Sequence, residues 1–309
     1  MTFRFRCLQS AVAAAAVVIS TQQLLAGPYV SDANTIGLYH FDETSGAADP
    51  GNPFVNSGTG GSSLNFTNTG GPDGRDNTGG GGYGAASYSG FGSAFGALAA
   101  GDGTYHTGTS GSATGGGAAT SAAVTQSALQ GADGAFTYEA IINLTANTTD
   151  EQTILAHDGS TTRGFLFRVT GGKLSLYDVN ETIDATIPTT GPHAFNASKW
   201  YHVAVAYDGN AGVAGNTTFY WTAMDSGASQ ANAIGTATIS VDLTGTASNL
   251  LGVGGTTRSP FRFETELVDE VRISSVARGP NDFLVPEPAM VSLLAIGGLL
   301  LGCRRRRKN

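Results

Sequence analysis

Acidic side chains near the C-terminal end of the chain's main body are the first candidates for chemistry. In the segment LVDEVRIS, residues 267–274, alternate residues are apolar and Asp269 falls among them. A carboxylate on a buried strand face is costly unless it is paired, hydrogen-bonded or bound to a metal. A hard cation such as calcium, with oxygen ligands, is one natural partner, and backbone amides at a strand end are the alternative. The turn Asp49-Pro50-Gly51-Asn52 offers carboxylate, amide and backbone oxygens for such an ion.

A second acidic set shares the opposite strand parity and consists of Glu264, Glu266 and Glu270. We expect this row to face solvent; the alternative is a catalytic carboxylate pair of the kind that glycoside hydrolysis requires. The sequence has no Gly-x-Ser-x-Gly elbow, and its histidines lack the spacing of zinc ligands. Those histidines are His40, His106, His157, His193 and His202, of which His202 is predicted to pack inside a strand.

The charge of the chain excludes nucleic acid as an expected partner. The formal net charge is −8, yet seven of the 16 basic residues lie at the two ends of the chain. The stretch 27–285 therefore holds 9 basic and 23 acidic residues, a net charge of −14. Such a surface attracts cations and is repelled by anionic polymers.

The N-terminus has the layout of a secretory signal peptide. Arg4 and Arg6 precede an apolar run from Ala11 to Ile19, and the small residues Ala26 and Gly27 follow. We expect residues 1–26 to be removed by signal peptidase; the alternative is a buried helix of the mature domain.

The C-terminus combines a Pro-Glu-Pro tripeptide with an apolar segment and a basic tail. Pro286, Glu287 and Pro288 come first, and residues 289–303 carry no charge, which is short for an unassisted membrane span. The basic cluster that follows is Arg304, Arg305, Arg306 and Arg307, with Lys308. This three-part pattern resembles the PEP-CTERM sorting signal of bacterial surface proteins.

The resemblance implies export, a transient membrane anchor formed by a short transmembrane helix over 286–309, and cleavage near the tripeptide by an exosortase-type protease. The alternative is a plain tail anchor with a chance Pro-Glu-Pro. Processing at both ends would remove Cys7 and Cys303, the two cysteines of the chain. The body is therefore expected to fold without disulfides.

Between the two ends the sequence predicts strands. Short runs alternate apolar and polar residues and are punctuated by Gly, Asn, Asp and Pro, as in FTYEAIINL (136–144), WYHVAVAYDG (200–209) and ATISVDL (237–243). Gly171-Gly172 stands between two such runs and predicts a tight hairpin. About ten strands without intervening helices favour a single all-β, antiparallel two-sheet sandwich over residues 27–285.

Residues 57–135 are rich in glycine, which the chain uses 45 times in its 309 residues. Their composition predicts long loops or flexible insertions between strands. A domain boundary in this region is the alternative.

Four segments together resemble the laminin-G-like or concanavalin A-like jelly rolls. They are GLYHFDETSG with the following AADPGN, FTYEAIINL, KWYHVAVAYDG and LVDEVRISSVARGPNDF, in the family's order between residues 36 and 283. Ile141 stands where the second segment of the family usually carries tryptophan. The resemblance implies a jelly-roll sandwich whose opening turn and closing strand lie together.

Some related jelly rolls bind calcium at that place, and by position this implicates Asp49, Asn52 and Asp269 as metal ligands. Glucanases of the same fold carry E-x-D-x-x-E on one strand, a pattern that the residues around Glu266 do not reproduce in order or spacing. The resemblance therefore favours a protein that is not an enzyme.

The function expected from these observations is a non-catalytic binding module, exported and presented at the cell surface or in the extracellular matrix. Its ligand would be an extracellular polysaccharide or another surface protein. The alternatives are a divergent glycoside hydrolase and a structural matrix component without a specific ligand. Aromatic residues that could stack on sugar rings, or equally lie in the core, are Tyr83, Tyr88, Tyr105, Tyr177 and Trp221.

Overall fold

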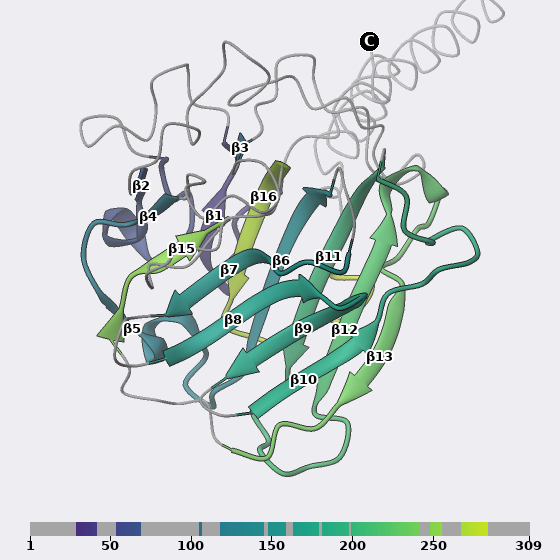
Figure 1. Ribbon diagram of the computed structural model, residues 1–309. Helices are drawn as coiled ribbons and strands as arrows, with labels where there is room; N and C mark the ends of the chain where they lie inside the picture. Colours follow the sequence, from purple (N-terminus) through teal and green to yellow (C-terminus); the bar gives the residue numbers. More distant parts are fainter. Residues whose placement is uncertain are drawn as a thin grey trace, which may run out of the picture.

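The computed structural model describes the strands and turns of the body (Figure 1). The described residues are 29–41, 54–68, 105–106, 118–144, 148–158, 163–178, 181–197, 199–241, 248–254 and 267–283. The predicted signal peptide, the predicted sorting segment 286–309 and the turn 49–52 lie outside them. No helix in the described ranges is long and apolar enough to cross a membrane.

The first sheet has seven strands in the order β1-β16-β6-β11-β12-β13, with β3 also paired to β16. All of its pairings are antiparallel. Its strands are β1 (Thr35–Tyr39), β3 (Tyr105–His106), β6 (Phe136–Asn143), β11 (Trp200–Tyr207), β12 (Thr217–Ala223), β13 (Ala233–Ala237) and β16 (Leu267–Ser274).

The second sheet also has seven strands, in the order β10-β9-β8-β7-β15-β4-β2, and lies in front of the first sheet in Figure 1. Its strands are β2 (Phe66–Asn68), β4 (Ala118–Thr120), β7 (Gln152–Asp158), β8 (Arg163–Thr170), β9 (Lys173–Asp178), β10 (Glu181–Thr186) and β15 (Leu251–Val253). A two-stranded sheet joins β5 (Val124–Thr125) to β14 (Ser248–Asn249), and the helical turns are η2 (Gly61–Leu64), η3 (Gln126–Leu129) and η4 (Met224–Ser226). The expected all-β antiparallel sandwich is confirmed.

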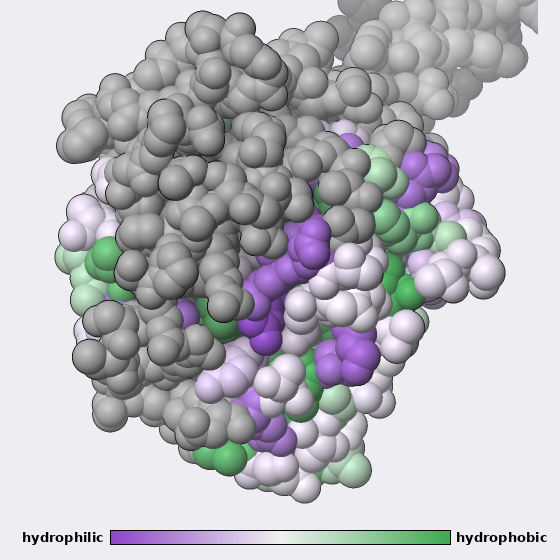
Figure 2. All heavy atoms as spheres, in the orientation of Figure 1, coloured by the Kyte–Doolittle hydropathy of each residue, from purple (hydrophilic) through white to green (hydrophobic). Residues whose placement is uncertain are grey.

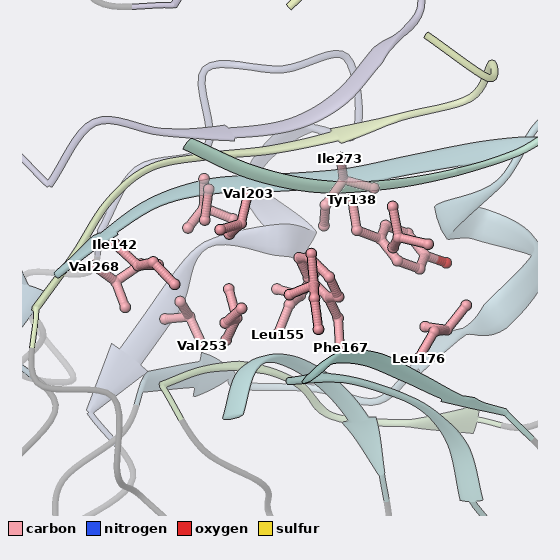
Figure 3. Packing of buried hydrophobic residues seen from close by; sticks show 14 of the residues in the cluster. Tyr138, Ile142, Leu155, Phe167, Leu176, Val203, Val253, Val268 and Ile273 are labelled. Atoms are coloured by element: carbon pink, nitrogen blue, oxygen red, sulfur yellow. The ribbon is translucent and has the colours of Figure 1, made fainter. Parts of the chain in front are cut away.

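The core between the sheets is built by the alternation that the sequence shows. Tyr138 and Ile142 of β6 and Val203 of β11 point toward Leu155 and Phe167 of the second sheet (Figure 3). All five side chains are buried, and the predicted inward faces of β6 and β11 are confirmed. Burying each of these apolar side chains removes it from water at a gain of about 1.5–3 kcal/mol.

The predicted hairpin is also confirmed. Gly171 and Gly172 join β8 to β9 with φ angles of 58° and 75°. Positive φ at both central residues is the requirement of the tight turn whose twist matches that of the flanking strands.

In the segment ATISVDL, the described residues 238–241 do not form the predicted strand. Strand β13 ends at Ala237, and Val241 is exposed. The buried Asn216 side chain takes the place of a neighbouring strand for Ile239. Its Oδ1 accepts from the Ile239 N–H and its Nδ2 donates to the Ile239 carbonyl, each at 2.8 Å. A side-chain amide therefore satisfies the backbone here, and Ile239 reaches the core without sheet pairing.

Trp221 belongs to this core, since its side chain is fully buried, and it is not a surface platform. We expect Trp221→Ala to lower the free energy of unfolding by about 3–5 kcal/mol, because the cavity adds to the lost transfer energy. Urea denaturation measures the change. Thr236→Ala, at an exposed position of β13, is the control and should change it by less than about 0.5 kcal/mol. Equal stability of the two variants would contradict the assignment of Trp221 to the core.

Candidate functional site

The closing strand contains a bulge that reverses the parity expected from its sequence. Asp269 pairs with Ile141 and Arg272 pairs with Glu139, so two residues of β16 oppose a single residue of β6. Glu270, within the bulge, has a φ of 48°, in the left-handed region that non-glycine residues rarely occupy.

Because of this bulge, Val268 lies in the core before it, and Val271 and Ile273 lie in the core after it. The parity argument that grouped Asp269 with Val271 and Ile273 is therefore wrong. The side chain of Asp269 itself is outside what the structure describes.

The expectation that Glu270 faces solvent is also wrong. Glu270 is 3% exposed, and its Oε2 accepts from the backbone N–H of Tyr29 at 3.1 Å. The Nδ1 atom of His40 lies 3.0 Å from the same oxygen. Glu264 and Glu266, the other members of the predicted row, lie outside the described residues.

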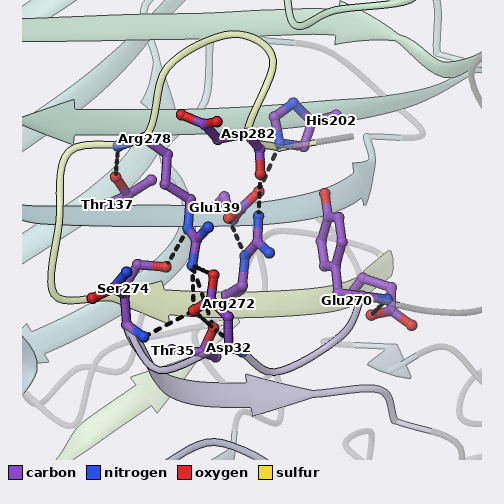
Figure 4. A network of polar contacts seen from close by, with 12 residues as sticks. Asp32, Thr35, Thr137, Glu139, His202, Glu270, Arg272, Ser274, Arg278 and Asp282 are labelled. Atoms are coloured by element: carbon purple, nitrogen blue, oxygen red, sulfur yellow. Dashed lines mark hydrogen bonds and ion pairs between the residues drawn. The ribbon is translucent and has the colours of Figure 1, made fainter. Parts of the chain in front are cut away.

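Behind Glu270, three charged or polar side chains meet on the outer face of the first sheet (Figure 4). Glu139 of β6 is 1% exposed; its Oε1 accepts from Nε of Arg272, and its Oε2 accepts from Nε2 of His202 at 3.0 Å. A carboxylate can only accept, so the His202 proton lies on Nε2. We call Glu139, His202 and Arg272 the outer polar cluster.

The electrostatics of the outer polar cluster favour an ionised Glu139. Burial alone would raise the pKa of Glu139, but the Arg272 guanidinium and the hydrogen bond from His202 together hold that pKa below its usual value. Burial would likewise lower the pKa of Arg272, and the Glu139 carboxylate reverses this and raises it. The pair is therefore charged on both sides and mutually dependent.

Tyr29 closes the cluster from outside. Its ring stands 4.7 Å from the Arg272 guanidinium carbon, in cation–π geometry, and edge-on to the His202 ring. Burial is the main cause of the raised pKa of its phenol. Tyr29 also belongs to an apolar group on this face that includes Ile141, Tyr220 and Phe283. The cluster is thus sealed beneath side chains from both described ends of the chain.

Residues 275–283, which we call the closing segment, are fastened beside the outer polar cluster. Arg278 is buried; its Nη2 lies 2.8 Å from Asp32 Oδ2, and its Nε donates to Ser274 Oγ at 2.8 Å. The Arg278 backbone N–H donates to Thr137 Oγ1, and this hydroxyl donates to the carbonyl of Val276. Partial burial would raise the pKa of Asp32. Its hydrogen bonds with Thr35 and the Asn34 N–H, together with its ion pair with Arg278, lower that pKa instead.

Polar residues of three sequence motifs therefore converge. Glu139 comes from FTYEAIINL, His202 from KWYHVAVAYDG and Arg272 from the closing strand. His202 was predicted to pack inside a strand, whereas Glu139 and Arg272 were not among the candidate site residues. The available signal was a charged residue within an apolar strand in each case, but the partner strands could not be identified without the sheet order. The arrangement is enclosed within the fold and gives no access to a substrate.

The predicted calcium ligands are not brought together by any described feature. Asp49 and Asn52 lie outside the described residues, and nothing describes the Asp269 side chain. Within the part of the chain that the structure describes, no group of three His, Cys, Asp or Glu residues could hold a metal ion. Calcium at this place stays a prediction.

Of the five aromatic residues that could stack on sugar rings or lie in the core, the structure describes the side chains of two. Tyr83 and Tyr88 lie outside the described residues, and only the backbone of Tyr105 is described, in β3. Tyr177 is half-buried on β9, and Trp221 is in the core.

Comparison with known protein families gives a match over residues 114–282. The matching family is of the laminin-G type and is described as the Concanavalin A-like lectin/glucanases superfamily. This span covers more than half of the chain and confirms the predicted jelly-roll resemblance. A search of curated proteins finds no match.

Solved structures similar to the chain are distant in sequence. Domain 4 of an extracellular arabinanase from Geobacillus stearothermophilus, in complex with arabinotriose, is 15% identical, with coverage of 81% of this chain and 96% of that domain and a TM-score of 0.41. The receptor-binding domain of a botulinum neurotoxin mosaic serotype C/D is 11% identical, with coverage of 85% and 51% and a TM-score of 0.46. CBM40 of the Ruminococcus gnavus IT-sialidase, bound to α2,3-sialyllactose, is 13% identical, with coverage of 48% and 80% and a TM-score of 0.36. The chain thus spans about half the length of the neurotoxin domain.

We expect Glu139→Gln to lower the free energy of unfolding by about 3–5 kcal/mol at neutral pH, because Arg272 would stay buried without an opposite charge. The double variant Glu139→Leu with Arg272→Met removes both charges and should recover much of this loss. Urea denaturation of the wild type and both variants measures the effect. A double variant no more stable than Glu139→Gln would show that the two charges are not coupled.

The same pair gives a pH dependence whose sign is fixed. Because the folded-state pKa of Glu139 is depressed, its stabilisation is present above the usual glutamate value of about 4.3 and is lost as the pH falls through the depressed value. The stability difference between wild type and Glu139→Gln should therefore shrink in acid. A difference that is constant from pH 7 to pH 3 would contradict this assignment.

Proposed function

Because the chain belongs to the Concanavalin A-like lectin/glucanases superfamily, we propose that it is a non-catalytic binding module for extracellular carbohydrate. The family description includes both binding proteins and hydrolases, so membership alone leaves both activities open. The observation that supports binding is that Glu139 and Glu270, carboxylates of the motif strands, are both buried and engaged inside the fold.

A retaining or inverting glycosidase needs two carboxyl groups that flank the substrate bond in an accessible cleft. Glu139 is held by Arg272 and His202, and Glu270 by Tyr29 and His40, so neither is available to a polymer. Because these carboxylates are engaged inside the fold, the strands that carry the family motifs form the scaffold. We expect the loops to contact the ligand.

The described part of the surface suits a polar ligand. On the face shown in Figure 2, hydrophobic residues lie in small separate groups between hydrophilic ones. The large hydrophobic side chains exposed among the described residues are four separate valines, Val30, Val55, Val213 and Val241. A surface of this kind favours a hydrated polymer over a partner that docks through an apolar patch.

The proposal includes export and sorting, which rest on the sequence of the two ends. The signal peptide 1–26 would direct secretion, and the Pro286-Glu287-Pro288 segment with its basic tail would hold the protein in the membrane until an exosortase-type protease acts. The processed protein would reside at the cell surface or in the extracellular matrix. A calcium ion held by Asp49, Asn52 and Asp269 is also kept as a proposal.

Two rival functions stay distinguishable. A divergent hydrolase would have to use carboxylates such as Glu264 or Glu266, and a structural matrix component would bind no specific ligand. A surface protein as the partner would leave a glycan screen empty.

We expect the full chain to bind one or more neutral polysaccharides on a glycan array without releasing reducing sugar from them. Parallel arrays with millimolar calcium and with EDTA test the predicted calcium ion. If the ion stabilises the binding-competent fold, glycan binding should be stronger with calcium than with EDTA. Sugar release from laminarin or a similar polymer that disappears in Glu266→Gln would overturn the non-catalytic assignment. An empty array would remove carbohydrate as the ligand.

The sorting proposal predicts the mass of the mature protein. Protein isolated from the native host should lack residues 1–26 and the residues after about Val285, because both ends are read as processing signals. Intact-mass spectrometry decides the matter. A mature species that retains Arg304 to Arg307 would contradict the proposed processing at the C-terminus.

A further inference from the structure

A surface depression lies where three segments that are distant in the sequence meet. The connection from β10 to β11 contributes His193, the connection from β12 to β13 with the first residue of β13 contributes residues 228–233, and the closing segment contributes Pro280. The depression has a volume of about 410 Å³, within the range of small-molecule sites. The Ala231 N–H donates to the Pro280 carbonyl at 2.9 Å and fixes two of its walls together.

The imidazole of His193 is fixed in orientation at this depression. Its Nδ1 accepts from the Ala223 N–H at 3.3 Å, and its backbone carbonyl accepts from Nε1 of the buried Trp221 at 3.1 Å. Partial burial lowers the pKa of His193, which keeps the ring neutral at pH 7. In a neutral ring whose Nδ1 accepts, the proton lies on Nε2, so His193 presents one oriented donor.

The amide of Asn232 is fixed in the same way. Its Nδ2 donates to the Trp221 carbonyl at 3.1 Å, while its backbone N–H donates to Thr222 Oγ1 and its carbonyl accepts from the Trp221 N–H. Among the described residues no donor reaches its Oδ1, which is left as an oriented acceptor. The residues that line the depression therefore include a donor and an acceptor whose side chains are held by the fold before any ligand arrives.

The rest of the lining is small, apolar or uncharged. The described lining residues include no Asp, Glu, Lys or Arg. Ser229 and Gln230 are exposed and add further hydroxyl and amide groups. The apolar lining residues are Ala228, Ala231, Ala233 and Pro280.

This combination matches the chemistry of a neutral sugar. A sugar ring offers hydroxyl groups that both donate and accept, together with apolar C–H patches, and it brings no charge that a counter-ion must balance. A charged ligand would meet no opposite charge among the described lining residues. An apolar ligand would leave the oriented groups of His193 and Asn232 without partners, at the cost of desolvating them.

We propose that the depression formed by His193, residues 228–233 and Pro280 is a binding site for one unit of a neutral oligosaccharide. This inference rests on the proposed carbohydrate-binding function and assigns it a place.

The test uses isothermal titration of the full chain with the neutral trisaccharides maltotriose, cellotriose and laminaritriose, and with trigalacturonic acid as a charged comparison. The wild type should bind at least one neutral trisaccharide more tightly than the charged one. Gln230→Ala with Ser229→Ala should weaken that binding by about three- to tenfold, the loss expected for one or two neutral hydrogen bonds. Ser229→Trp, which fills the depression, should abolish measurable binding.

Val213→Trp is the matched control, since Val213 is also exposed but lies in the connection from β11 to β12 and does not line the depression. It should bind as the wild type does. The imidazole resonances of His193 should shift on titration, whereas those of the buried His202 should not.

The outcomes separate this site from the general function. Neutral sugar binding that Ser229→Trp and the double alanine variant leave unchanged overturns the site but not the carbohydrate function. Equal or tighter binding of trigalacturonic acid overturns the assignment of a neutral ligand. Absence of binding to any trisaccharide, together with an empty glycan array, overturns both.

Discussion

Arg272, Glu139 and His202 lie on the outer face of a sheet whose neighbouring positions are apolar, and the charges of Arg272 and Glu139 must be balanced there without water. The guanidinium of Arg272 and the imidazole of His202 reach opposite oxygens of the Glu139 carboxylate. This balance requires β16 and β11 to flank β6, which is the observed strand order. It also requires a cover, and Tyr29 and Phe283 supply it from the two described ends of the chain.

A buried ionic group of this kind is a poor source of net stability, because desolvation offsets much of the attraction. Its stronger effect is to destabilise alternative strand pairings. A β6–β16 pairing shifted by one residue would place Glu139 toward the apolar core and leave Arg272 without its partner. We infer that the outer polar cluster helps to specify the register of the central strands, while the apolar contacts between the two sheets supply most of the stabilisation.

Much of the fold could be predicted from sequence because strand alternation is local. The inward faces of β6 and β11 and the hairpin at Gly171-Gly172 follow from neighbouring residues alone. The β16 bulge could not be predicted, since it depends on the positive φ of Glu270 and on contacts with Tyr29 and His40, which are more than 200 residues away. Glu270 is buried because Tyr29 and His40 cover it, and no local feature of its strand predicts that cover. The hydrogen bonds of Asn216 to Ile239 could not be predicted for the same reason. Nor could the meeting of the three segments that form the depression at His193.

The fastening of the closing segment has a mechanical consequence. Any load applied to the chain beyond Phe283 reaches β16 only through residues 275–283. Arg278 ties that segment to Asp32 next to β1, and its backbone ties it to Thr137 of β6, so tension would be shared with the two strands that flank β16 before β16 itself could be pulled from between them. If the chain were anchored through residues beyond Phe283, the closing segment would bear the pulling force first. It would thereby protect the pairing of β16 with its neighbours from mechanical unfolding.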